Sequence, residues 1–86
     1  MSDDLKTRFE TALAAAKNLT ERPSNDDLLE LYALYKQSTA GDVSGDRPGL
    51  LDFVGGAKFD AWRELKGMAS DDAMARYVEK VNALKG

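Results

Sequence analysis

The sequence predicts an all-α protein, an up-down-down-up four-helix bundle with a long crossover loop between its second and third helices. Apolar residues recur at helical spacing in four stretches, and Gly and Pro residues separate these stretches. No segment shows the period-two alternation that is typical of a half-buried strand. The 86 residues suffice for one domain, expected over residues 1–86, with a single modest core.

The first predicted helix covers about residues 2–19. Ser2, followed by two aspartates, provides its start, because acidic residues favour the first turn of a helix. Pro23 prevents its continuation, since the residue before a proline avoids the helical conformation. Its apolar stripe consists of Leu5, Phe9, Ala12, Leu13 and Ala16.

The second predicted helix covers about residues 25–39. Ser24 is a suitable N-cap, and Asp27, three residues later, is able to reach back to it as in a capping box. Gly41 is expected to stop the helix at its C-terminal end. Its stripe consists of Leu28, Leu31, Tyr32 and Tyr35.

A glycine-rich stretch from 41 to 56 is predicted to form the crossover loop. It holds five of the seven glycines and Pro48. Arg47 is expected to fix the loop by pairing with Asp46, Asp52 or a carbonyl group. The apolar side chains of the stretch are expected to be buried and to anchor the loop. They are Val43, Leu50, Leu51, Phe53 and Val54.

The third and fourth helices are predicted over about 55–66 and 70–84. Trp62 is expected in the core, and Gly67 ends the third helix. Ser70, again followed by two aspartates, starts the fourth. Short connections make helices one and two antiparallel, and likewise three and four, whereas the long loop lets two and three run parallel. The fourth stripe consists of Met74, Tyr77, Val78, Val81 and Leu84.

The residue types that the chain lacks limit its chemistry. Without Cys there is no disulfide, no thiolate metal site and no cysteine nucleophile, and without His the usual general base is missing. A net charge of −3 argues against a nucleic-acid partner. We therefore expect no catalytic residue, metal or cofactor. The charged N-terminus and the short apolar runs predict that the chain has no signal peptide and no transmembrane segment, so a cytoplasmic location is the default expectation. We also expect a monomer.

Tyr32, Tyr35 and Lys36 share one face of the second helix, because they stand at i, i+3 and i+4. A tyrosine suits the wall of a pocket, since its ring stacks and its hydroxyl forms hydrogen bonds. A lysine beside phenols must reach water or an anion. The residues alone leave two alternatives open: a core face, or a pocket for a ligand with a flat part and a phosphorylated part, such as a nucleotide.

Four linked motifs cover most of the chain. LYALYKQSTAGD, RPGLLDF, AKFDAW and YVEKV stand in the order and at the spacing of Y-x-x-Y-K-Q-A-T-x-G-D, R-P-G-x-x-D-F, A-K-W-D-A-W and Y-[IV]-x-K-[VL]. In these motifs the chain resembles the acyl-CoA-binding protein family from Phe9 to Leu84. The resemblance implies an up-down-down-up four-helix bundle that reversibly binds, carries and buffers long-chain fatty acyl-CoA esters.

The resemblance also implies residue roles. It places the adenine ring against Tyr35 and the phosphates against Lys36 and Lys58. Pro23, Gln37 and Trp62 match structural positions. Lys17, Tyr32 and Tyr77 match further ligand-binding positions, and Phe9, Ala12, Leu13 and Leu29 match an apolar slot for the acyl chain.

Three positions depart from the family pattern, besides the minor change of the usual Ala to Ser38. Val54 and Gly56 stand where many members carry lysine, and Phe59 replaces the first Trp of A-K-W-D-A-W. Position 54 often contributes to the ligand site, so we expect Val54 to leave out a polar contact there.

Two alternatives belong to other functional classes. A helical bundle is also able to serve as a protein-interaction module without a small ligand. A CoA-thioester hydrolase would need a nucleophile and a base, but the chain has no His, no Cys and no G-x-S-x-G motif. We therefore expect a binding protein and not an enzyme.

Overall fold

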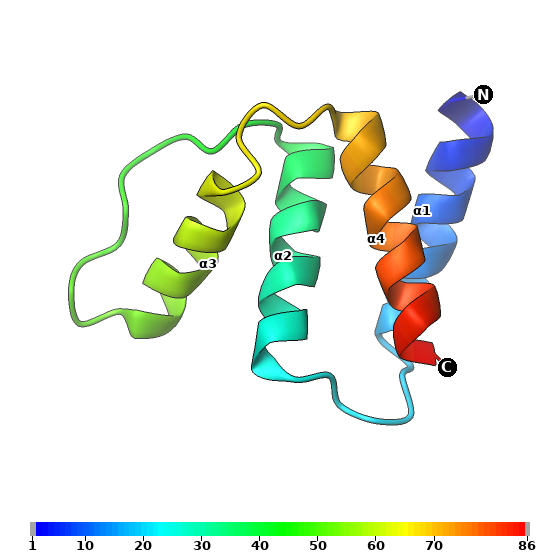
Figure 1. The fold of residues 1–86 in the computed structure, drawn as a ribbon, viewed down its shortest axis with the longest axis horizontal. Coiled ribbons are helices and arrows are strands. Elements are labelled where there is room, and N and C mark those ends of the chain that lie inside the picture. Colours follow the sequence, from blue (N-terminus) through cyan, green and yellow to red (C-terminus); the bar gives the residue numbers. More distant parts are fainter. Residues whose placement is uncertain (1, 86) are drawn as a thin grey trace.

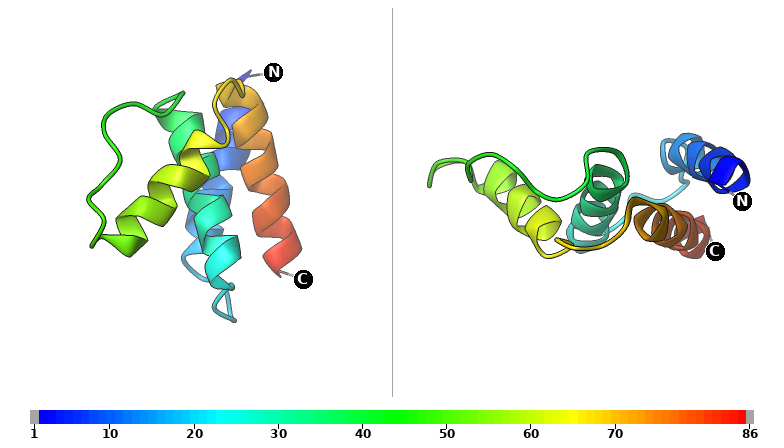
Figure 2. Two further views of the ribbon diagram at one scale, coloured as in Figure 1. Left: turned by 60° about the vertical axis from the view of Figure 1, so that its left-hand side comes forward. Right: turned by 90° about the horizontal axis from the view of Figure 1, so that it is seen from above.

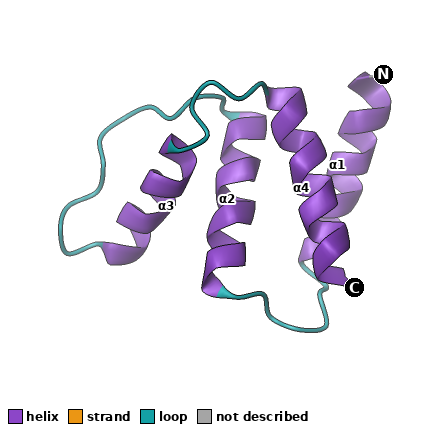
Figure 3. Cartoon of the chain, viewed as in Figure 1, coloured by secondary structure: helices purple, strands orange, loops and turns teal. Residues whose placement is uncertain are grey.

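The computed structural model describes residues 2–85, with side chains from Asp4 onwards. No strand occurs within these residues, so the all-α prediction is confirmed (Figure 3). The side chains of Ser2 and Asp3, the predicted start of the first helix, lie outside the described ones. The helices are α1 (Ser2–Ala16), α2 (Asn25–Thr39), α3 (Phe53–Arg63) and α4 (Ser70–Lys85).

The helices follow the predicted up-down-down-up course. α1 and α2 are antiparallel, α2 and α3 run parallel after the crossover loop, and α4 reverses the direction again (Figure 1). α4 packs against α1 and α2, whereas α3 packs against α2 alone among the described helices. The result is a flat molecule of 38 × 30 × 15 Å with α3 at one end, which the view from above makes clear (Figure 2).

The core lies where α1, α2 and α4 meet. Leu34 and Ala73 join the predicted stripe residues there, and Leu34 shares the face of Leu31 three residues earlier. Leu28 and Tyr35 stand at the edge of this core and are 36% and 41% exposed. The buried core residues are Phe9, Ala12, Leu31, Leu34, Ala73, Tyr77, Val78 and Val81.

Gln37 attaches the loop after α2 and the connection between α3 and α4 to the C-terminal end of α2. Its fully buried side-chain amide donates to Asp42 Oδ1 at 2.9 Å and to the Met68 carbonyl at 2.8 Å. The Gly67 N–H also donates to Asp42 Oδ1, at 2.8 Å. These two donors, Gly67 first, lower the pKa of Asp42. Gly41 ends the helix with a φ of +82°, a conformation that glycine adopts without strain.

Trp62 attaches α3 to the same end of α2. Its side chain is 8% exposed, and its Nε1–H donates to the Gly41 carbonyl at 2.8 Å. The Lys36 ammonium lies 4.9 Å from the centroid of the indole ring. The predicted burial of Trp62 is therefore confirmed.

The crossover loop is far less buried than its sequence predicts. Val43 is half-buried, but the prediction of burial is wrong for the other four apolar residues of the segment. Because α3 packs on α2 alone, the loop passes outside the row of helices and no helix covers it (Figure 1). The exposed fractions are 85% for Leu50, 91% for Leu51, 78% for Phe53 and 67% for Val54.

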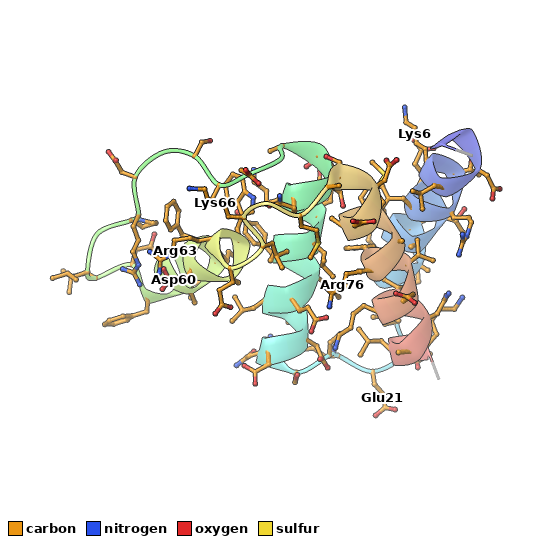
Figure 4. All side chains as sticks on the ribbon, turned by 45° about the horizontal axis from the view of Figure 1, so that its top comes forward. Lys6, Glu21, Asp60, Arg63, Lys66 and Arg76 are labelled. Carbon is orange, nitrogen blue, oxygen red and sulfur yellow. The ribbon has the colours of Figure 1, made fainter. Side chains whose placement is uncertain are left out.

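Arg47 holds the loop against α3. Its Nε and Nη2 donate to Oδ1 and Oδ2 of Asp60, which is labelled in Figure 4, at 3.0 and 2.9 Å. The pair raises the pKa of Arg47 and lowers that of Asp60. Gly56 makes room for this contact, since a Cβ there would lie 2.9 Å from Arg47 Nη2. The prediction that Arg47 pairs with Asp46, Asp52 or a carbonyl group is therefore wrong. Arg47 pairs with Asp60 instead, because Gly56 has no side chain to block its path across α3.

An ion pair joins the N-terminal turn of α2 to α4. Lys80 Nζ lies 2.6 Å from Asp27 Oδ1 and 3.4 Å from Glu30 Oε1. The Asp27 N–H donates to Ser24 Oγ at 3.1 Å, which confirms Ser24 as the N-cap. The hydrogen bond from Lys80 is the largest cause of the lowered pKa of Asp27, and the Ser24 groups contribute to it.

Asp27→Asn is expected to remove a pH-dependent part of the free energy of unfolding. Because the folded-state pKa of Asp27 lies below its ordinary value of 3.8, the pair stabilises fully above that pH. This stabilisation is lost as the pH falls through the lowered pKa. Urea unfolding at a series of pH values should show the gap between the wild type and the variant narrowing in acid. Asp26→Asn is the control, and a gap that does not change with pH would contradict the prediction.

Candidate ligand-binding site

A groove of about 430 Å³ collects all three tyrosines of the chain. Tyr32 and Tyr35 come from successive turns of α2, Tyr77 from α4, and Lys58 from α3. We call this surface the aromatic groove. It is lined by Ala16, Leu19, Pro23, Leu28, Leu31, Tyr32, Tyr35, Lys58 and Tyr77.

Phe9 of α1 supports two of the tyrosines from the core. Its ring stacks on Tyr35 with the centroids 6.5 Å apart, and it meets Tyr77 edge-on at 5.2 Å. Because Tyr35 is partly exposed, it keeps ring surface open for stacking with a ligand. Burial, and secondarily Tyr35, raises the pKa of Tyr77. Its hydroxyl is therefore protonated at neutral pH and able to donate a hydrogen bond.

The two predicted phosphate-binding lysines differ in position. Lys58 Nζ lies 5.3 Å from the centroid of the Tyr32 ring, at the wall of the aromatic groove. Lys36 instead lies against Trp62 and is not part of this wall. In both contacts a cation rests on a ring face, which stabilises by about 0.5–1 kcal/mol at exposed sites. Lys58 is thus the cation that the structure places beside the tyrosines.

A second groove, of about 460 Å³, adjoins the first between α2 and the start of α3. Leu28 and Lys58 line both grooves, so the two grooves adjoin there, and we call the two together the depression. We call the second one the apolar groove. Arg22 is its other cation, and its Nη2 donates to Asn25 Oδ1 at 3.2 Å. The lining residues are Arg22, Asn25, Leu28, Leu29, Phe53, Val54, Ala57 and Lys58.

The predicted site residues fall into three groups. Tyr32, Tyr35, Lys58 and Tyr77 line the aromatic groove, whereas Leu29 and Val54 line the apolar groove. The remaining five, Lys17, Lys36, Phe9, Ala12 and Leu13, line neither groove.

The four acyl-slot candidates do not share one groove. Phe9 lies in the core beneath Tyr35, and Ala12 lines a separate hollow of about 220 Å³ between α1 and α4. Leu13 packs at the edge of the core. Of the four, Leu29 alone lines the depression, so these residues do not line one common slot in this structure.

Sequence reasoning missed several groove residues. Leu28 was placed in the same helical stripe as the two tyrosines of α2, but it was not expected to line the site. Phe53 was expected to be buried in the loop. Arg22 gave no signal, because its neighbour Pro23 marks the end of a helix and says nothing of a binding surface.

The depression offers three kinds of contact along its length. Open aromatic surface lies at Tyr35, a cation stands at Lys58, and an apolar trough continues along α2 and α3. Such an arrangement suits a ligand with a flat ring, an anionic part and an apolar chain. Among the described side chains no group of three or more acids gathers where a metal ion could bind. Within residues 2–85 no helix is both long and apolar enough to cross a bilayer.

Comparisons with known proteins agree on one family. The family model described as "Acyl CoA binding protein" matches residues 6–81. "Acyl-CoA-binding protein homolog" of Manduca sexta is 49% identical over 81 residues, which is 93% of this chain and 90% of the relative. "Acyl-CoA-binding protein homolog 1" of Caenorhabditis elegans is 53% identical over 88% of each chain. The crystal structure of Oryza sativa Acyl-CoA-Binding Protein 2 superposes with a TM-score of 0.93, at 42% identity, over 96% of this chain and 90% of the other.

Proposed function

The chain belongs to the acyl-CoA-binding protein family, and we propose that it reversibly binds and carries long-chain fatty acyl-CoA esters. The observation that carries the proposal is that the aromatic groove and the apolar groove adjoin at Leu28 and Lys58, which line both. One depression thereby offers separate contacts for a nucleotide head and for a fatty tail. The relatives are named for binding, so the expectation that the chain is not an enzyme is confirmed.

The aromatic groove is proposed to hold the CoA head. Tyr35 stacks on the adenine, and Lys58 forms charge-assisted hydrogen bonds with phosphate oxygens. Tyr32 and Tyr77 complete the wall. Lys36 and Lys17 are proposed to turn toward the phosphates when the ligand arrives, since the flexible lysine stem allows such a movement.

The apolar groove is proposed to hold the first part of the acyl tail. Leu28, Leu29 and Ala57 of α2 and α3 face it, and Phe53 and Val54 extend it toward the crossover loop. Withdrawal of the tail from water stabilises the complex by about 0.8 kcal/mol for each fully buried CH₂. Val54 fits this role because it adds apolar surface at a position where the family pattern has lysine in many members.

We further propose that the chain acts as a cytoplasmic monomer with one acyl-CoA-binding domain over residues 1–86. Both grooves are built by a single chain around one core, which supports a monomeric domain. The lack of Cys suits a reducing compartment.

Palmitoyl-CoA is expected to raise the melting temperature of the protein. A ligand that binds the native state alone adds about 2.7 kcal/mol at a hundredfold excess over its Kd. Thermal unfolding followed by circular dichroism checks this, and CoA without a tail serves as the control with a smaller shift. If no acyl-CoA shifts the melting temperature, the protein-interaction module becomes the better hypothesis. If the thioester is hydrolysed during incubation, the protein is a hydrolase.

A further inference from the structure

Four apolar side chains stand exposed at one end of the molecule. Leu50, Leu51, Phe53 and Val54 are between 67% and 91% exposed and follow one another from the crossover loop into the first turn of α3, interrupted only by Asp52. We call these four residues the apolar tip. The crossover loop lies at the end of the longest axis of the molecule, beside α3 and on the side away from α1 and α4 (Figures 1 and 2).

The apolar tip is held in a defined position. The Arg47–Asp60 ion pair fixes the loop before it, and the Asp52 N–H donates to the Gly49 carbonyl at 3.0 Å. Asp52 Oδ1 accepts from the Gly55 N–H at 2.9 Å and caps α3. The carboxylate within the tip is therefore engaged with the helix N-terminus, where the helix dipole offsets its charge.

We propose that the apolar tip inserts into the surface of a lipid bilayer and turns the mouth of the apolar groove toward the membrane. The inference deepens the proposed function, because it takes the apolar groove as the site of the acyl tail. Phe53 and Val54 belong to both the tip and the groove, so the two surfaces are continuous. A tail is then able to pass between the groove and the bilayer without exposing its methylenes to water.

A bilayer fits this surface better than a second copy of the chain. A stable protein interface takes about 20–30 residues on each side, whereas the tip offers four. The crossover loop lies at the end of a flat molecule of 38 × 30 × 15 Å (Figure 2). A lipid surface needs no shape complementarity, and apolar side chains at the end of an element are able to enter it.

Vesicle flotation without acyl-CoA tests the proposal. The wild-type protein is expected to float with phosphatidylcholine vesicles, and Leu51→Glu is expected to bind at least tenfold more weakly. Ser44→Glu is the matched control, because it adds the same charge to an exposed position of the same loop and leaves the tip intact. Flotation of Leu51→Glu at the wild-type level, or no flotation of the wild type, would overturn the proposal. Wild-type self-association in sedimentation velocity, abolished by Leu51→Glu and without flotation, would assign the tip to a second copy instead.

A label provides a second, independent readout. The chain has no Cys, so Leu50→Cys carries a single environment-sensitive dye at the tip, and Ser44→Cys carries it at an exposed position six residues earlier in the same loop. Emission from position 50 is expected to shift to the blue on addition of vesicles, with a much smaller shift at position 44. Equal shifts at both positions would contradict insertion of the tip.

The melting shift with palmitoyl-CoA separates this proposal from the proposed function. Leu51 does not line either groove, so Leu51→Glu is expected to keep that shift. Loss of flotation together with a normal melting shift confines the defect to membrane docking. Flotation of the wild type without any melting shift would instead retain membrane docking and refute acyl-CoA binding.

Discussion

Trp62→Ala is expected to lower the free energy of unfolding by about 3–5 kcal/mol, the usual range for truncation of a buried aromatic side chain. Trp62 is 8% exposed and donates its indole N–H to the Gly41 carbonyl. The truncation leaves that carbonyl without its partner and removes the ring on which Lys36 rests. Since small domains are stable by about 5–15 kcal/mol, the variant would be marginally folded.

Urea unfolding followed by far-ultraviolet circular dichroism is the suitable measurement, because the substitution removes the single Trp that would report by fluorescence. Trp62→Phe is the matched control: it keeps an aromatic ring and loses the hydrogen bond, which should cost about 1 kcal/mol for the bond itself. An alanine variant as stable as the wild type would show that α3 is attached to α2 by other contacts.

The affinity for acyl-CoA is expected to rise steeply with tail length. At about 0.8 kcal/mol for each buried CH₂, extension from 8 to 16 carbons adds up to about 6 kcal/mol. The apolar groove supplies the surface for this burial, and its extension by Phe53 and Val54 keeps it apolar up to the loop. Calorimetric titration with CoA and with acyl-CoAs of increasing length measures the slope, with competition titrations for the tightest ligands.

Variants in the two grooves separate the head from the tail in the same titrations. Lys58→Ala should weaken the binding of every ligand by the same amount, about 1.5 kcal/mol for the loss of a charge-assisted hydrogen bond. The increase in affinity with tail length should stay unchanged. Lys36→Ala should also weaken the binding of every ligand, and it should lower the affinity more than it lowers the stability of the fold. Phe53→Ser should lower the slope and leave CoA binding unchanged. A Lys58→Ala variant with unaltered affinity would refute the phosphate assignment.

Local patterns in the sequence predicted most of the helical framework. The second helix matches its expected bounds, 25–39, because cap, stripe and stop glycine agree. The third begins at Phe53, earlier than the predicted residue 55. The two glycines at its start indicate a loop, but the Asp52 side chain caps the first turn and lets the helix include them.

The site was predictable where it depends on helical spacing. Tyr32 and Tyr35 reach one groove because residues three apart share a helix face. The direction of Lys36 toward Trp62 and the reach of Arg47 to Asp60 depend on how α3 lies against α2, which no local pattern encodes. The same holds for the exposed apolar tip, since β-branched, leucine and aromatic residues in a loop predict burial unless the neighbouring helices are known.

α3 packs on α2 alone among the described helices, so the width of the apolar groove does not depend on how the core is packed. Apart from Arg22, the residues that line that groove belong to this helix pair, whereas the Phe9–Tyr77 contact lies among α1, α2 and α4. The hydrogen bonds around Gln37 and Trp62 join α3 and its flanking connections to one end of α2 and act as a pivot. A small swing of α3 about this end would change the width of the groove and would leave the packing among α1, α2 and α4 unchanged, because α3 contacts neither α1 nor α4 among the described helices.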